Sequence, residues 1–286
     1  MQTENAIDKA SFEKQGYGIA RSVFSRDEVA SLRADVYKQL ETDQKKGLVY
    51  QVPPFKAQFV NGDLLSKELL YRVLLDDRIL SIAQSALGAK DLVYFGDSSY
   101  QTGTGSNGFH RDNIDRSDLN APDWQGKYTL LRLGIYLQDH SNFSGGLKIR
   151  TGSHRASTGK AVFVNSKVGD VVFWDLKTLH SGNAVRLKAM PDFSVNVAIA
   201  ERLIPGFLRK EEEQERISMF MTFAVKSAHL HRYLTEYTLK RKDTIDHAKA
   251  SVRSAEAIAL AAQKNVRVID PLTDSAFIEE CRSMSR

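Results

Sequence analysis

The sequence predicts a mainly β fold with helices at both ends, built around an antiparallel sandwich or jelly roll. From residue 91 onward, short segments rich in β-branched and aromatic residues alternate with Gly, Asn and Asp. The stretches before and after them carry apolar residues at helical spacing. We therefore expect a single domain over residues 1–286, with a β-core at about 91–204 and a helical C-terminal extension at about 205–286.

Two helical regions precede the expected core. Ser25 and Glu28 are placed to form a capping box, and Phe24 and Val29 to form a hydrophobic staple. A second helical region runs through "SKELLYRVLLDDRILSIAQSAL", and Gly88 is placed to end it.

The expected strands follow one another without long helices between them. They are "DLVYFGDSSYQ", "KYTLLRLGIYLQ", "GGLKIR", "KAVFV", "GDVVFWD" and "FSVNVAIAERL". After Pro205 the long, charged stretch "FLRKEEEQERISMFMTFAVKSAHLHRYLTEYTLKRKDTIDHAKASV" is predicted to be helical.

Composition excludes several classes of protein. Cys281 is the one cysteine, so neither an internal disulfide nor a thiolate zinc site is expected. No run of 18 apolar residues and no signal-peptide pattern is present, which favours a cytoplasmic protein with no membrane partner. The net charge of +5 is dispersed, which argues against nucleic acid and suits a small anionic ligand. A homodimer is compatible with the charged C-terminal region.

The stretch "GFHRDN" carries a candidate metal site. On a strand, His110 and Asp112 point to the same face, so both can bind one ion. His180 follows Asp112 after 67 intervening residues, across several expected strands. Two histidines and one carboxylate form the facial triad of non-haem Fe(II) oxygenases, which leaves positions open for a co-substrate and O2. We expect the other histidines, including His140, to lie at the surface or to be structural.

An oxidisable co-substrate with a carboxylate also needs a fixed cation. Arg186 follows His180 by six residues and offers a bidentate fork. Arg132, within the apolar strand "LLRLGIYL", is the alternative. Gln101, shortly before His110, is a further candidate cofactor contact.

These segments together resemble the phytanoyl-CoA dioxygenase family of Fe(II)- and 2-oxoglutarate-dependent oxygenases, over roughly residues 11–203. "FEKQGYGIARSVFSRDEVASLRADV" is similar to the family's opening elements, and "FHRD" to its H-x-D motif. "YLQDHSNFSGGLKIRTGSHR" and "GDVVFWDLKTLHSGNAVR" resemble the segments that lead to and contain the distal histidine.

The resemblance implies a double-stranded β-helix core, with His110, Asp112 and His180 as ligands of Fe(II). It implies 2-oxoglutarate and O2 as co-substrates, and hydroxylation or another oxidation of an unactivated C–H bond with release of succinate and CO2. Because Asp112 is present, it implies oxygenation rather than halogenation. The family's 2-oxoglutarate arginine stands just before the last core strand, where we read "LKAMPDF", which contains no arginine.

The substrate is expected to be a small molecule, polar or anionic. Candidate substrate contacts lie near the triad in the sequence: Tyr100, Asn113, Arg116 and Trp174. The loop "DNIDRSDLNAPDWQGK" is long enough to act as a lid. Two alternatives remain at this point: a cupin-like metal enzyme that does not use 2-oxoglutarate, and a non-catalytic sensor on the same fold.

Overall fold

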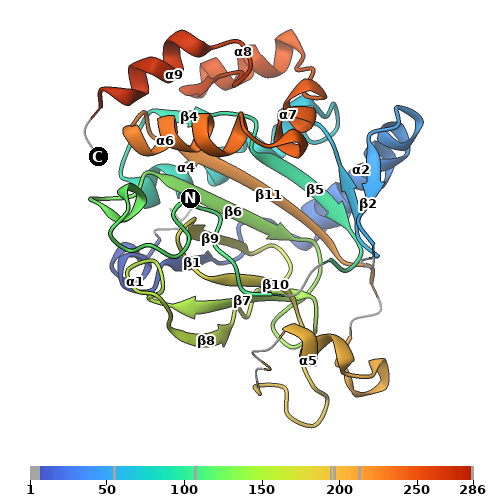
Figure 1. The fold of residues 1–286 in the computed structure, drawn as a ribbon. Helices are drawn as coiled ribbons and strands as arrows, with labels where there is room; N and C mark the ends of the chain where they lie inside the picture. Colours follow the sequence, from blue (N-terminus) through green and yellow to red (C-terminus); the bar gives the residue numbers. More distant parts are fainter. Residues whose placement is uncertain are drawn as a thin grey trace, which may run out of the picture.

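Two antiparallel sheets face each other at the centre of the molecule, with helices packed on the outside of the larger one (Figure 1). The computed structural model describes residues 7–53, 56–105, 108–193, 195, 198–211 and 214–284. This arrangement confirms the expected jelly roll with helical flanks. The extent of the single domain stays a prediction.

The larger sheet has the strand order β1-β9-β6-β11-β5-β3-β2, and β4 and β12 extend it beside β11. All of its pairs are antiparallel except that of β12 with β4. Its strands are β1 (Tyr17–Ala20), β2 (Val49–Gln51), β3 (Gln58–Val60), β4 (Leu92–Tyr94), β5 (Ser98–Thr102), β6 (Leu130–Tyr136), β9 (Val171–Asp175), β11 (Ile217–Ala224) and β12 (Val266–Val268). The smaller sheet has the order β10-β7-β8, formed by His180–Ala184, Gly146–Thr151 and Lys160–Phe163.

Successive side chains of the larger sheet alternate between a helix-covered face and a face directed at the smaller sheet. On β6, Leu131, Leu133 and Ile135 belong to the main apolar core with the N-terminal helices. Tyr136 belongs instead to a second apolar cluster that includes Ile149 of β7 in the smaller sheet. We call the face that carries Arg132, Gly134 and Tyr136 the inner face.

The N-terminal helical regions that the sequence predicts are present, and they pack against the face of the larger sheet opposite the inner face, which we call the outer face. They are α1 (Lys9–Gln15), α2 (Arg26–Lys45), α3 (Tyr71–Leu74) and α4 (Asp77–Leu87), with a 3-10 turn at Leu64–Ser66. Ser25 and Glu28 form the predicted capping box of α2. Gly88 ends α4 with a φ of 68°, which favours glycine because it has no Cβ.

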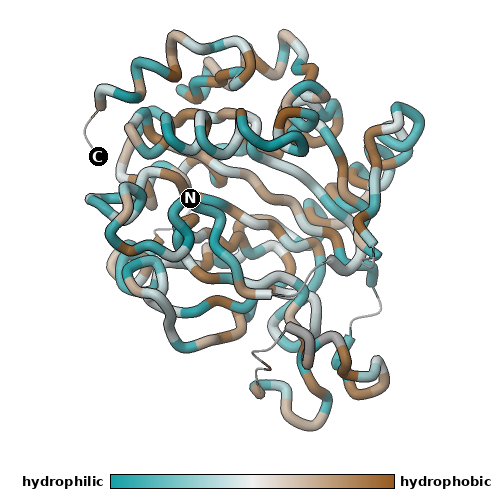
Figure 2. Tube along the Cα trace, in the orientation of Figure 1, coloured by the Kyte–Doolittle hydropathy of each residue, from teal (hydrophilic) through white to brown (hydrophobic). Residues whose placement is uncertain are grey.

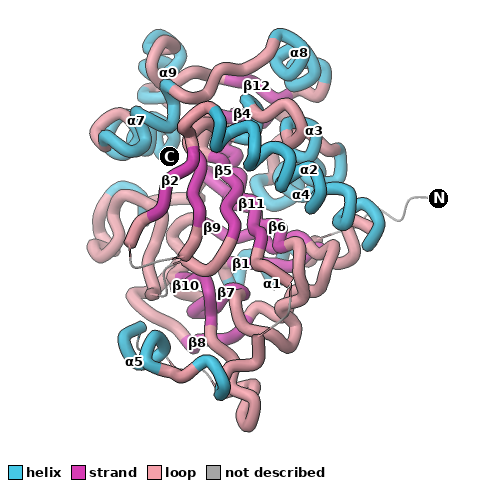
Figure 3. Tube along the Cα trace, turned by 90° about the vertical axis from the view of Figure 1, so that its right-hand side faces the viewer, coloured by secondary structure: helices cyan, strands magenta, loops and turns pink. Residues whose placement is uncertain are grey.

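The sequence prediction was wrong in two places beyond His180. Residues 217–224, expected to be helical, form β11 at the centre of the larger sheet, between β6 and β5. Seven of the eight β11 residues are buried, so packing against two neighbouring strands outweighs the helical pattern of the flanking charged residues. The segment "FSVNVAIAERL", expected to be a strand, contains α5 (Ala198–Leu203). Figure 3 shows α5 beside β8 of the smaller sheet, far from α8 and α9.

The remaining C-terminal residues form a helical layer over β4 and β11 (Figures 1 and 3). It consists of α6 (Ala228–Arg232), a π-helix at Tyr233–Thr238, α7 (Lys242–Lys249), α8 (Ala255–Gln263) and α9 (Ser275–Arg282). Hydrophilic and hydrophobic residues alternate along these helices (Figure 2), as expected for helices that bury one side. Among the described residues, no helix is long and apolar enough to cross a membrane.

A buried ion pair joins α2 to the segment before α3. Lys67 Nζ lies 3.2 Å from Asp43 Oδ1, and both side chains are almost fully buried. Lys67 also donates to the carbonyl oxygen of Asn61 at 2.7 Å. Burial lowers the pKa of Lys67, and the Asp43 charge opposes this effect.

We predict that Lys67→Met lowers the free energy of unfolding by about 3–5 kcal/mol, because it leaves the Asp43 carboxylate buried without its cation. Urea denaturation measures the change. In the matched control, Lys264→Met removes an exposed pair with Asp77 and should cost less than about 1 kcal/mol. Equal effects of the two substitutions would contradict the prediction.

Candidate metal centre

Backbone hydrogen bonds bring the three predicted ligands together. The segment that contains His110 forms an antiparallel bridge with the first residue of β10, His180. The amide of each histidine donates to the carbonyl of the other, at 2.9 and 3.0 Å. Two residues on, the amide of Asp112 donates to the carbonyl of Leu176 at 2.9 Å. All three ligands are therefore positioned through the main chain.

The side chains of His110, Asp112 and His180 converge. One candidate ligand atom from each lies within 4.8 Å of the others. Nε2 of His110 is 3.7 Å from Asp112 Oδ1, and Nε2 of His180 is 3.4 Å from Asp112 Oδ2. Asp112 and His180 are buried, whereas the side chain of His110 is half exposed. The centre thus has one side open to approach.

Both imidazoles are oriented for metal binding. Nδ1 of His110 lies 3.0 Å from the carbonyl oxygen of Gly108, and Nδ1 of His180 lies 3.0 Å from that of Thr178. A carbonyl only accepts, so Nδ1 of each ring carries the proton and Nε2 keeps a lone pair facing Asp112. Two such nitrogens and a carboxylate oxygen fit a divalent iron ion.

The electrostatics of the centre favour the ligand forms of these groups. Burial lowers the pKa of His180 to about 4, although the Asp112 charge opposes this effect, so the imidazole is neutral at pH 7. Burial also tends to raise the pKa of Asp112. The charges of Arg132, His180 and His110 outweigh that effect and lower the pKa to about 2, so the carboxylate is ionised.

Arg132 extends from the inner face of β6 to the carboxylate ligand. Its Nη1 donates to Asp112 Oδ2 at 3.0 Å and its Nη2 to Asp97 Oδ2 at 2.7 Å, while Nε donates to the hydroxyl of Thr222 at 3.0 Å. All three nitrogens of the guanidinium are therefore engaged. Arg132, predicted as a contact of the co-substrate, therefore lies at the metal centre, but its guanidinium bonds the ligand Asp112 and a second carboxylate, that of Asp97.

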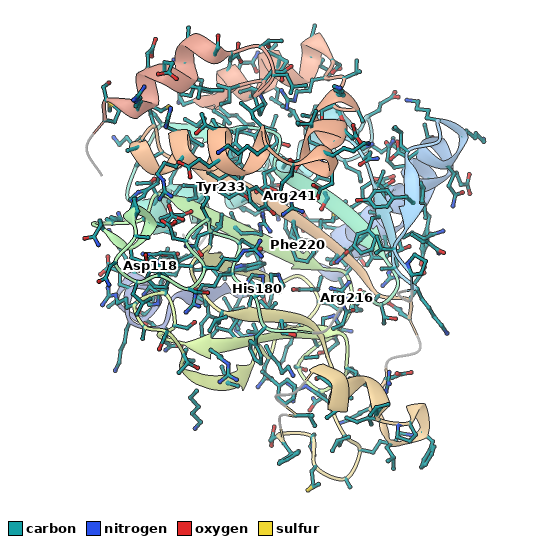
Figure 4. All side chains as sticks on the ribbon, viewed as in Figure 1. Asp118, His180, Arg216, Phe220, Tyr233 and Arg241 are labelled. Carbon is teal, nitrogen blue, oxygen red and sulfur yellow. The ribbon has the colours of Figure 1, made fainter. Side chains whose placement is uncertain are left out.

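Aromatic residues form the wall beside His180. The ring of Trp174, on β9, lies 5.2 Å from the imidazole of His180 and 6.1 Å from the ring of Phe220 on β11. Gly134 provides the space, because a Cβ there would lie 3.1 Å from Trp174 and 3.2 Å from Phe220. Figure 4 labels His180 and Phe220 in this central region. Trp174 is thus placed next to the triad, as the sequence predicts.

Tyr100 and Gln101 point to opposite faces of β5. Gln101 lies opposite Ser218 of β11 and donates to its hydroxyl at 3.0 Å, on the inner face. Tyr100 is buried in the outer core, and its hydroxyl donates to Asp43 of α2 at 2.7 Å. The expectation that Tyr100 contacts substrate is therefore wrong, because adjacent strand residues cannot share a face.

Arg186 lies on the other side of the smaller sheet from His180. Its guanidinium stacks on Phe163, donates to the carbonyl of Pro191 at 3.1 Å and bonds the Asn165 side chain. Phe163 is paired through β7 with Ser181, whose side chain faces away from that of His180. The structure therefore does not bring Arg186 to the triad.

A different arginine, Arg216, lies at the start of β11 on the inner face. It is 6% exposed, and no described carboxylate forms an ion pair with it. Nε donates to the carbonyl of Gly145 at 2.7 Å and Nη1 to that of Gly103 at 3.4 Å, and the guanidinium lies 5.6 Å from the ring centre of Tyr136. Burial lowers the pKa of Arg216. A buried guanidinium without an anion is a strong candidate to bind an acidic ligand.

Neutral groups surround Arg216. His140, which we expected at the surface, is buried; burial and the Arg216 charge lower its pKa to about 3. Tyr136 contacts Phe220, so the wall beside His180 continues to Arg216 (Figure 4). In the sequence, Arg216 stands directly before β11, but residues 217–224 are predicted to be helical, so the sequence gives no reason to select it.

Hydrogen bonds and ion pairs hold the loop after Asp112 in place. Asn113 is fully buried and donates to Asp123 Oδ2 at 3.1 Å, so it shapes the loop. Arg232 of α6 bonds both Asp115 and Asp123, at 2.6 and 2.9 Å. Arg116 is exposed, donates no side-chain hydrogen bond to a described residue, and its charge lowers the pKa of Asp112. Asn113 and Arg116 are the loop residues predicted to contact substrate, and of these two only Arg116 has an exposed side chain that could bind it.

The family model for phytanoyl-CoA dioxygenase (PhyH) matches residues 12–188, which include the whole triad. The chain belongs to the PhyH family. The predicted enzyme class, non-haem Fe(II)- and 2-oxoglutarate-dependent dioxygenase, is thereby confirmed, as are its cofactors Fe(II), 2-oxoglutarate and O2. Among curated proteins, no sequence match was found.

Solved structures confirm the fold. HygX from Streptomyces hygroscopicus, with nickel and 2-oxoglutarate bound, is 17% identical with a TM-score of 0.52, covering 74% of this chain and 84% of its own. The epimerase SnoN from nogalamycin biosynthesis is 16% identical with a TM-score of 0.55, covering 77% and 81%. The carbocyclase SnoK is 18% identical with a TM-score of 0.54, covering 79% and 85%.

We predict that Asp112→Asn weakens binding of Ni(II) to the metal-free protein by more than the roughly 100-fold that changes outside the ligand shell cost. The substitution keeps the shape of the side chain but removes the charge that binds the cation. Calorimetric titration measures the affinity. His231→Gln, on α6 and outside the triad, is the matched control and should bind Ni(II) as the wild type does. Unchanged affinity in Asp112→Asn would contradict the assignment.

Proposed function

We propose that this enzyme oxidises an unactivated C–H bond of a small molecule, with hydroxylation as the basic reaction. In that reaction, 2-oxoglutarate loses CO2 and becomes succinate; one oxygen atom of O2 enters succinate and the other enters the substrate as a hydroxyl group. Fe(II), when bound, supplies the redox chemistry. The convergence of His110, Asp112 and His180 is the observation that carries the proposal.

The protein's residues would bind and orient the reactants. The carbonyls of Gly108 and Thr178 keep Nε2 of the two histidines directed at the ion. Trp174 and Phe220 exclude water from the side of His180, which strengthens electrostatic interactions in the centre. The exposed side of His110 leaves room for substrate to approach.

Arg216 is proposed to bind the distal carboxylate of 2-oxoglutarate, in place of Arg186 and Arg132. It has the charge and the burial that a carboxylate contact needs, and its Nη2 donates to no described residue. Arg132 is already bound to two carboxylates, and Arg186 faces another part of the molecule. Gln101 lies on the same inner face as Arg216 and is proposed to line the 2-oxoglutarate site.

For the substrate, we propose a polar or anionic small molecule that Arg116 contacts. Its guanidinium, which pairs with no described carboxylate, lies near the centre on an exposed loop. HygX has been solved with hygromycin B and SnoN with nogalamycin RO, so enzymes with this fold accept small molecules. A cytoplasmic location and self-association as a homodimer stay predictions from the sequence.

The proposed function is tested by incubating the protein with Fe(II), 2-oxoglutarate and O2, and measuring succinate with and without a panel of anionic small molecules. We expect slow succinate release alone, a faster rate with a suitable substrate, and none in Asp112→Asn. Failure of the metal-loaded protein to bind 2-oxoglutarate under anaerobic conditions would contradict the proposal.

We predict that Arg216→Gln weakens anaerobic binding of 2-oxoglutarate to the Ni(II)-loaded protein by at least about 30-fold, the equivalent of about 2 kcal/mol for loss of a buried charged hydrogen bond. The matched change Arg186→Gln should leave this affinity unchanged. Calorimetry measures both. The reverse outcome, with Arg186→Gln impaired and Arg216→Gln normal, would assign the contact to Arg186 instead.

A further inference from the structure

We propose that the C-terminal helical layer, which lies outside the matched family region, supports the metal centre through Tyr233, Asp97 and Arg132. In this role Asp97 and Tyr233 are positioning residues. They hold the Arg132 guanidinium on the Asp112 carboxylate and balance its charge. The inference rests on Asp112 being a metal ligand but not on the identity of the substrate.

A continuous chain of hydrogen bonds links the C-terminal layer to the metal ligand. The hydroxyl of Tyr233 donates to Asp97 Oδ2 at 3.1 Å, and the same oxygen accepts from Arg132 Nη2 at 2.7 Å. Arg132 Nη1 then donates to Asp112 Oδ2 at 3.0 Å. Oδ1 of Asp112 accepts no hydrogen bond from a described residue, so it keeps its lone pairs for an ion.

Charge explains why Asp97 is needed. A guanidinium bonded directly to a ligand carboxylate repels a divalent cation and cancels the ligand's charge. Asp112, Asp97 and Arg132 together carry a net charge of −1. Without Asp97 the net charge would be zero, and Arg132 would oppose metal binding without compensation. Asp97 therefore allows Arg132 to orient Asp112 without removing the charge that attracts the ion.

The shape of the guanidinium explains why arginine occupies position 132. Its three nitrogens bond three acceptors that come from different strands or turns: Thr222 of β11, Asp97 before β5, and Asp112. The amide of Thr222 also donates to the carbonyl of Asp97 at 2.9 Å, so two of these acceptors are fixed to each other. A lysine ammonium has no planar fork and cannot hold this geometry.

The π-helix explains how Tyr233 is positioned. It begins at Tyr233, and the amide of Leu239 donates to the carbonyl of Leu234 at 2.9 Å, the i+5 pattern. Such turns are rare and often occur at functional sites. The Tyr233 ring is 2% exposed, packs edge-on against Phe95 at 5.6 Å and stacks on Tyr237 at 5.0 Å. Its hydroxyl is therefore fixed on Asp97. Figure 4 shows Tyr233 in the upper part of the central region.

We predict that Asp97→Asn weakens Ni(II) binding to the full-length, metal-free protein by about 10- to 100-fold, and Tyr233→Phe by about 10-fold, as changes next to metal ligands do. Arg132→Lys, which keeps the charge but loses the fork, should weaken it at least about 10-fold. Tyr237→Phe is the matched control: it removes a hydroxyl from the neighbouring ring, for which no hydrogen bond to a described residue is seen, and should bind Ni(II) normally.

Two further measurements separate positioning from folding. Thermal unfolding of each metal-free variant shows whether it is folded at the titration temperature, and only folded variants are compared. In the double variant, Tyr233→Phe should add little to Asp97→Asn, because Tyr233 acts through Asp97. Fully additive losses of Ni(II) affinity would show that Tyr233 does not act through Asp97.

The outcomes also distinguish this inference from the proposed function. If the wild type binds Ni(II) and the folded Asp97→Asn and Tyr233→Phe variants bind it equally well, the inference is overturned while the oxygenase proposal stands. If the variants lose Ni(II) affinity but wild-type protein releases no succinate, the positioning role is supported and the proposed reaction fails.

Discussion

The metal centre depends on one short antiparallel bridge between the segment at His110 and the first residue of β10. Two backbone hydrogen bonds there join residues 70 positions apart in the chain and set both imidazoles side by side, with ring centres 4.3 Å apart. A third, from Asp112 to Leu176, places the carboxylate. Because main-chain bonds fix all three ligands, the geometry of the centre is a property of the sheet and does not require the ion to assemble it.

The alternation of side chains across the larger sheet lets the same strands build the core and the active site. On β6, Arg132 and Gly134 face the metal centre while Leu131, Leu133 and Ile135 anchor the strand under the N-terminal helices. By the same alternation on β5, Gln101 faces the inner side and Tyr100 faces the core under the helices. Buried charges are tolerated on the inner face because Arg132 lies between two carboxylates. Arg216 forms no ion pair with a described carboxylate, and this difference supports the proposal that it binds an acidic ligand.

The segment between β10 and β11 is where the fold departs most from the sequence prediction. Between β10 and β11, the described residues include α5, whose Glu201 forms a buried ion pair at 2.8 Å with Lys148 of β7 in the smaller sheet. Contacts with Phe163, Pro191 and Asn165 hold Arg186 away from the centre, and the last central strand begins only at residue 217. The following helices return over β4 and β11, so Tyr233 reaches Asp97.

The local sequence determined much of this protein: the capping box of α2, the end of α4 at Gly88, most strands of the β-core, and the H-x-D motif with its distal histidine. These features depend on near neighbours in the chain or on the period of the apolar residues. Only the tertiary structure decided that residues 217–224 form a central strand, that Arg216 rather than Arg186 faces the inner side, and that Asp97 and Tyr233 support Asp112. Each of these depends on which strands lie adjacent and which face a side chain takes, and pairing between distant segments is settled by packing of the whole sheet rather than by local propensity.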